Sequence, residues 1–223
     1  MSEILKTTIL GLFFGTFGTT LGGIIGVLIK KQSNKFLGFI LSFASGLMMS
    51  IICFDLIPEA LEISDISKVI MGIILGILIM IFCDLLVQKR FNIKNNSEKN
   101  RINNNLLKVG MVVSIGLAIH NFPEGLAIGA GFEASIKLGL SLAIAICFHD
   151  IPEGISMAVP MKNGGMKKKK VILYVILSGI TTGIGAFFGA LVGSISKEVI
   201  SICLSFAAGA MLYIVSRRIN TRI

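Results

Sequence analysis

The sequence predicts an all-α protein, a polytopic bundle of membrane-spanning helices. Of its 223 residues, 54% are hydrophobic and only 15% are charged, whereas soluble domains average about 45–50% and about 25%. The apolar residues gather in seven runs of roughly 20, the length that a helix needs to cross a bilayer. These runs are too long for barrel strands and lack their alternation.

The seven predicted helices follow one another through the chain. Acidic residues are rare in these helices: the third has Asp84, the fourth has Glu124, and the fifth has Asp150 and Glu153. We expect one transmembrane domain, 1–223, with a flexible cytoplasmic loop rich in Asn and Lys at about 90–108. The predicted helices span about 7–29, 36–58, 69–88, 107–132, 138–161, 171–196 and 199–216.

Positive residues predict the orientation of the helices. Most of the 21 Lys and Arg residues lie in the loops after the first, third and fifth helices and in the C-terminal tail. Because cytoplasmic loops are enriched in Lys and Arg, we expect a multi-pass plasma-membrane protein with its N-terminus outside and the C-terminus of this chain inside. The same bias accounts for the net charge of +9 without nucleic acid as a partner, and leaves the lipid bilayer as the expected surroundings.

Two internal repeats organise the chain. Leu-Ser-Phe-Ala-Ser-Gly at 41–46 recurs as Leu-Ser-Phe-Ala-Ala-Gly at 204–209, and Thr19 matches Thr182 at the same offset. Helices one and two therefore correspond to helices six and seven, in opposite directions. Such inverted repeats are typical of secondary transporters, although chance similarity between Gly-rich helices is the alternative. A second repeat relates the fourth and fifth helices, the central pair.

This second repeat carries the candidate chemistry. Residues 120–125 read His-Asn-Phe-Pro-Glu-Gly and residues 149–154 read His-Asp-Ile-Pro-Glu-Gly. Within each motif, the Glu lies four residues after the His and three after the Asn or Asp, which are neighbouring positions on a helix. Pro123 and Pro152 leave a backbone carbonyl without its helical donor, so we expect each helix to kink there. The candidate ligands are His120, Asn121, Glu124, His149, Asp150 and Glu153.

Three acidic side chains buried in membrane helices require a positively charged partner. Each charged group costs about 3 kcal/mol on insertion scales, and neither helix interior contains a Lys or Arg. Imidazole and carboxylate together suit zinc, iron, manganese or cobalt. A hydrogen bond between helices or a kink near the interface would explain one such motif equally well, but two copies on adjacent helices favour a metal site.

These motifs resemble those of the ZIP family of divalent-metal transporters, most of all its bacterial zinc-uptake branch. Phe-Asp-Leu-Ile-Pro-Glu-Ala at 54–60 resembles the end of the family's second helix. The resemblance implies a protein that moves zinc and similar ions into the cytoplasm, forms a homodimer and needs no organic cofactor. It implies a two-metal centre with His120, Glu124, His149 and Glu153 at the first metal. The second metal would be held by Asn121, Glu124, Asp150 and Glu153.

Two further acids lie near the predicted outer end of the second helix. Asp55 and Glu59 are candidates for the entrance path of the ion, and an exposed pair of helix-end acids is an equally good explanation. The family also has an eighth helix, which is apparently missing here, since the counterpart of residues 55–59 reads Arg218 through Arg222 and the chain stops at 223. We therefore expect that the chain is truncated or frameshifted.

Three functions remain to be distinguished. The first is a metal-ion transporter, which the inverted repeat favours. The second is an intramembrane metalloenzyme, in which a metal-bound water attacks a peptide or lipid, although the chain has no His-Glu-x-x-His motif. The third is a transport-defective paralogue that binds metal without flux. We expect a transporter and not an enzyme.

Overall fold

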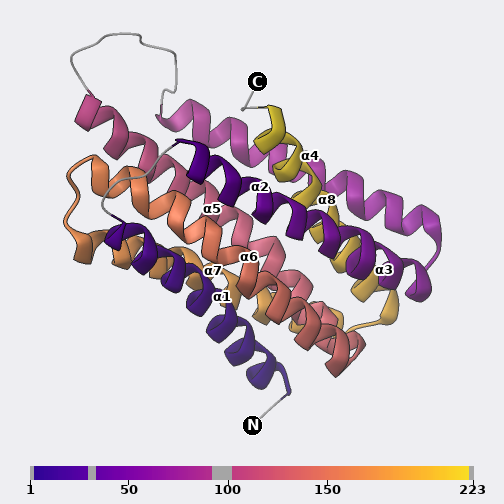
Figure 1. Cartoon of the computed structure of the whole chain (residues 1–223). Helices are drawn as coiled ribbons and strands as arrows, with labels where there is room; N and C mark the ends of the chain where they lie inside the picture. Colours follow the sequence, from indigo (N-terminus) through magenta and orange to yellow (C-terminus); the bar gives the residue numbers. More distant parts are fainter. Residues whose placement is uncertain (1–2, 30–33, 92–101, 221–223) are drawn as a thin grey trace.

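The computed structural model describes residues 3–29, 34–91 and 102–220, and within these ranges it contains helices and no strands (Figure 1). In these ranges, seven helical segments are long and apolar enough to cross a membrane, which confirms the predicted all-α polytopic bundle. Helices are favoured because a bilayer core offers the backbone no other hydrogen-bond partners. The helices are α1 (Glu3–Leu28), α2 (Asn34–Ile51), α3 (Ile57–Ile63), α4 (Ile66–Phe91), α5 (Ile102–Ala134), α6 (Ile136–Asn163), α7 (Lys168–Gly193) and α8 (Lys197–Asn220).

The segment predicted as one helix at 36–58 is interrupted. After α2, a π-helical turn covers Ile52–Leu56, in which the N–H of Ile57 donates to the carbonyl of Ile52, and α3 follows. Pro58 explains the wider turn, because its ring would otherwise collide with the carbonyl four residues earlier. In contrast, α5 and α6 continue as helices through Pro123 and Pro152, and the expected kinks there stay a prediction.

The helices α4 and α5 extend into the range 90–108 that is predicted as a loop. The helix α4 continues to Phe91 and α5 already begins at Ile102, so residues 102–108 are helical. Residues 92–101 lie outside the described residues, as do Lys30, Lys31 and Arg222 among the predicted topogenic charges. Helices extend beyond their apolar spans because helix elongation adds one backbone hydrogen bond for each residue once the nucleus is anchored.

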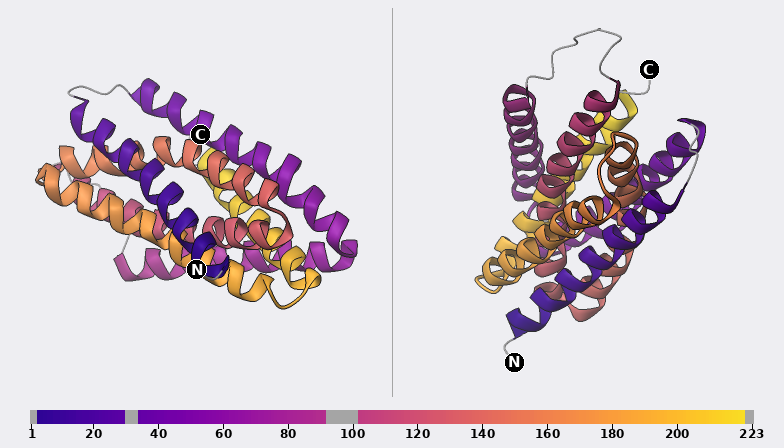
Figure 2. Two further views of the ribbon diagram at one scale, coloured as in Figure 1. Left: turned by 90° about the horizontal axis from the view of Figure 1, so that it is seen from below. Right: turned by 90° about the vertical axis from the view of Figure 1, so that its left-hand side faces the viewer.

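Four helices form the centre of the bundle. The most extensive packing pairs α5 with α7 and α1 with α6, while α1 also crosses α7 and α5 also crosses α6. The helix α4 packs mainly against α8 and lies at one side of the bundle (Figure 2). The helix α1 begins at one end of the molecule, and α8 ends at the opposite end (Figure 1). The motif-bearing helices α5 and α6 are therefore enclosed by α1 and α7.

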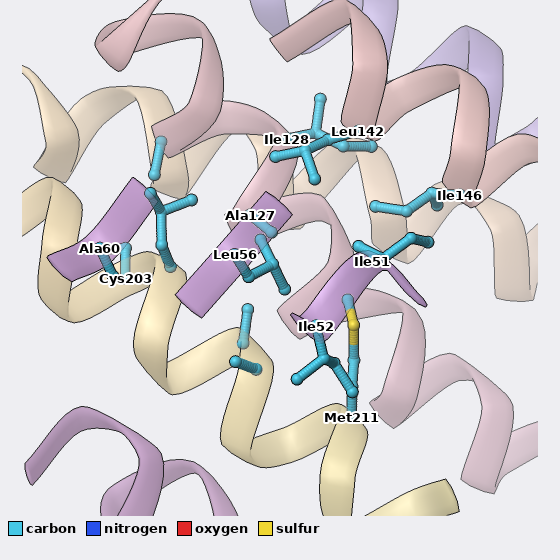
Figure 3. Packing of buried hydrophobic residues seen from close by; sticks show 14 of the residues in the cluster. Ile51, Ile52, Leu56, Ala60, Ala127, Ile128, Leu142, Ile146, Cys203 and Met211 are labelled. Atoms are coloured by element: carbon cyan, nitrogen blue, oxygen red, sulfur yellow. The ribbon is translucent and has the colours of Figure 1, made fainter. Parts of the chain in front are cut away.

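The largest cluster of buried apolar residues joins the π-helical turn to α5, α6 and α8. Ile52 and Leu56 are fully buried in it (Figure 3). The side chains around them include Ala127 and Ile128 from α5, Leu142 and Ile146 from α6, and Met211 from α8. We call this group the apolar cluster.

Candidate metal centre

Four side chains from the two motifs meet between α5 and α6. His120 and Glu124 lie one turn apart on α5, and His149 and Glu153 lie one turn apart on α6. Each of the four offers one ligand atom, and these atoms all lie within 4.8 Å of one another. All four side chains are buried. The chain has only two histidines, and both are in this group.

Glu124 lies at the middle of the group. Its Oε1 atom is 2.9 Å from Nε2 of His120 on the same helix and 2.8 Å from Nε2 of His149 on the other helix. The Nε2 atom of His120 is also 3.4 Å from Oε1 of Glu153. One carboxylate oxygen thus connects both imidazoles, and with them both helices.

The donor atoms of the group suit a divalent cation. Among the described residues, Nδ1 of His120, Nδ1 of His149 and Oε2 of Glu124 are buried without a hydrogen-bond partner. Neither Lys nor Arg occurs at 109–136 or 138–161, so no basic residue of these stretches can neutralise the buried acids. Uncompensated buried charge is unfavourable by several kcal/mol. A metal ion held by imidazole nitrogen and carboxylate oxygen would compensate it.

The remaining two motif residues flank this group. Asp150 is fully buried, with Oδ1 3.6 Å from Nε2 of His149. Asn121 is also fully buried, and its Nδ2 donates to the carbonyl of Ser178 on α7, 3.0 Å away. Motif spacing did not point to Ser178, because α7 approaches α5 only in the folded bundle. The structure therefore brings the six predicted ligands into one buried region, but only four of them into the compact group.

Asp55 and Glu59 stand apart from the compact group. Asp55 belongs to the π-helical turn and Glu59 to the first turn of α3, and both are half-buried. Ala127 and Ile128 follow Glu124 by about one turn on α5, and Ile146 precedes His149 by about one turn on α6. These members of the apolar cluster therefore lie on the side of the His and Glu side chains that faces the connection between α5 and α6 at Ser135.

Glycine lets the neighbouring helices approach the motifs closely. A Cβ atom at Gly125 would overlap the carbonyl oxygen of Thr182 on α7, and one at Gly154 would overlap the carbonyl oxygen of Thr19 on α1. Small residues permit such backbone approach between membrane helices. The last residue of each motif thus fixes the distance to the enclosing helix.

Comparison with known proteins agrees with this site. The sequence model described as "ZIP Zinc transporter" matches residues 96–219, which include both motifs. The chain belongs to the ZIP zinc transporter family. Proteins named "Zinc transporter ZupT" from Streptococcus mutans and Clostridium perfringens are 33% and 32% identical to it over 96% of this chain and 86% and 85% of their own lengths. The protein of that name from Corynebacterium glutamicum is 31% identical over 90% of this chain and 82% of its own length.

Membership of the ZIP family confirms two expectations from the sequence. The family is one of transporters, so this protein is not an enzyme. The seven apolar helices and the family together make it an integral, multi-pass membrane protein.

Proposed function

We propose that this protein transports zinc across the plasma membrane into the cytoplasm, through a site between α5 and α6 that holds two metal ions. The observation that supports this proposal most directly is the buried group of His120, Glu124, His149 and Glu153, with ligand atoms within 4.8 Å of one another. Iron, manganese and cobalt are further substrates, because the same nitrogen and oxygen ligands accept them. The zinc transporters similar to this chain favour transport over a paralogue that binds metal without flux.

The ligands divide between two ion positions. His120, Glu124, His149 and Glu153 hold the first ion, and Asn121, Glu124, Asp150 and Glu153 hold the second. Shared carboxylates are suited to bridging, since each carries two oxygens with about four lone-pair sites. The close contacts of Glu124 with two imidazoles and the buried position of Asp150 support this assignment. Asp55 and Glu59 form the entrance path on the outer side.

An inverted repeat underlies the proposed transport. The contacts of equivalent residues support it: Gly22 of α1 packs on the carbonyl of Ile151, and Gly185 of α7 packs on the carbonyl of Phe122. The two glycines are equivalent under one repeat, and the two carbonyls under the other. Such pairs of repeats let one part of a transporter move against the other around a fixed site.

The proposal includes the orientation of the protein in the membrane and its assembly. The N-terminus lies outside and the C-terminus of this chain inside, on the basis of the positive residues. The protein forms a homodimer in the bilayer, as its family resemblance implies.

Uptake of zinc-65 into proteoliposomes tests the function. We expect saturable uptake by the unmodified chain and its loss in Glu153→Ala. Glu133→Ala is the matched control, because Glu133 lies at the end of α5, only half-buried and outside the ligand group. Equal uptake by Glu153→Ala and the unmodified chain would overturn the proposal.

A further inference from the structure

The two motifs differ at one ligand position, where the first has Asn121 and the second has Asp150. The enclosing helices differ at the matching place. Asn121 faces Ser178 on α7, whereas Gly15 of α1 occupies the position equivalent to Ser178 under the repeat. The contacts around these two residues give a reason for the asymmetry.

On α7, the carbonyl of Ser178 accepts a hydrogen bond from Asn121. The Nδ2 atom of Asn121 is 3.0 Å from this carbonyl oxygen and 3.4 Å from the Ser178 hydroxyl. A carbonyl oxygen can only accept, so the amide of Asn121 must turn its nitrogen toward α7. Its other polar atom, Oδ1, is buried and has no hydrogen-bond partner among the described residues.

The threonines one turn later behave differently on the two helices, because on α7 another side chain occupies the acceptor. On α1, the hydroxyl of Thr19 donates to the carbonyl of Gly15, 2.7 Å away. The equivalent Thr182 is fully buried, yet within the described ranges its hydroxyl has no partner. Within α7, the Ser178 carbonyl already accepts the helical N–H of Thr182. The hydrogen bond from Asn121 takes its second lone pair, so this oxygen has no place left for the hydroxyl of Thr182.

We propose that Ser178 is a positioning residue for the metal centre: its carbonyl holds the amide of Asn121 so that Oδ1 is presented to the second metal ion. This inference rests on the proposed two-metal function, because only that function gives Oδ1 an ion to bind. It explains why an amide stands in the first motif. A carboxylate there would offer no donor and would place an oxygen against the carbonyl of Ser178.

A double-mutant cycle in detergent-solubilised, metal-free protein tests the hydrogen bond. In the unmodified chain, Thr182→Val should not lower the melting temperature, because the hydroxyl makes no bond. In the Asn121→Ala background the carbonyl is released, and the hydroxyl of Thr182 should take it as Thr19 does on α1. There, Thr182→Val should lower the melting temperature by about 2–4 °C, the usual effect of one hydrogen bond in a chain of this size. The same effect in both backgrounds would overturn the inference.

Replacement of a backbone amide by an ester tests the positioning itself. Incorporation of glycolic acid at Gly179 in the full chain makes the Ser178 carbonyl a poorer acceptor and leaves every ligand side chain unchanged. An ester at the buried Ala190 of α7 is the matched control, since it removes one helical N–H without touching Asn121. Cobalt(II) is the probe, and its visible absorption reports each binding event.

We expect the ester at 179 to weaken binding of the second cobalt ion about tenfold relative to the ester at 190, with equal affinity for the first ion. Equal affinity for the second ion in both proteins would overturn the positioning role. If the unmodified chain binds only one cobalt ion, the two-metal proposal and the ligand role of Asn121 both fail. The hydrogen bond between α5 and α7 would then still be decided by the double-mutant cycle.

Discussion

Glu124 is the residue whose replacement by its isosteric amide should disturb the metal centre most. Its Oε1 atom lies 2.9 Å from Nε2 of His120 and 2.8 Å from Nε2 of His149. In the proposed site, this carboxylate contacts both ions. Glu124→Gln keeps the volume and shape of the side chain but removes its charge, so any loss of affinity reports the charge and not a cavity.

The size of the effect follows from the loss of a buried ligand charge. Removal of one partner of a buried ion pair costs about 3–5 kcal/mol. Glu124→Gln removes the charge that this side chain would contribute to the metal ions, and a factor of ten in affinity corresponds to about 1.4 kcal/mol. We therefore expect zinc affinity to fall by about 10²- to 10⁴-fold. Asp150→Asn should weaken binding of the second ion only, because in the proposed site Asp150 contacts that ion alone.

Isothermal titration of zinc into the detergent-solubilised chain measures these affinities. Glu133→Gln is the control for Glu124→Gln, since it makes the same chemical change nine residues further along α5, outside the ligand group. The circular dichroism of each variant shows whether it remains folded. If folded Glu124→Gln bound the first zinc ion within about threefold of the unmodified chain, the central role of Glu124 would be refuted.

Three further predictions concern the stability of the bundle and are measured as thermal unfolding in detergent. Gly154→Ala should destabilise the protein by about 1–3 kcal/mol or more, because the added Cβ would overlap the backbone of α1. Gly116→Ala is the control and should have little effect, because Gly116 has open space around it. Equal melting temperatures of the two variants would contradict the close approach of α6 and α1. Leu56→Ala should cost about 2–5 kcal/mol because Leu56 is fully buried in the apolar cluster, and an effect below about 1 kcal/mol would argue against that packing. Asp84→Asn should loosen α4 from α8 by up to about 1 kcal/mol, because Asp84 forms an ion pair with the half-exposed Arg217 across the two helices, and no response of the melting temperature to salt would exclude a contribution from this pair.

The sequence by itself determined the fold class and the candidate ligands. Seven apolar runs predict seven membrane helices because a bilayer leaves the backbone no alternative to helical hydrogen bonds. The paired motifs predict ligands on one helix face because residues three and four apart are neighbours on a helix. Both inferences depend only on local chemistry and spacing, so His120, Glu124, His149 and Glu153 could be named before their positions were known.

Tertiary structure decided which atoms meet. Spacing suggested that Glu124 reaches toward His120, but only the antiparallel packing of α5 and α6 brings its Oε1 to His149, 25 residues away. Local pattern also missed the π-helical turn at Ile52–Leu56, because the apolar run of α2 continues into it as far as Phe54 and nothing in the spacing marks a wider turn.

The contact between Asn121 and Ser178 shows most clearly what sequence spacing cannot predict. Nothing in the spacing of either residue indicates that a backbone carbonyl of α7 meets an amide of α5, 57 residues apart in the chain. The close approach of the helices produces this contact, since glycine at the motif's last position brings the backbone of α7 against α5. Helix periodicity fixes the face on which a side chain lies, while the packing of small residues decides which backbone it touches.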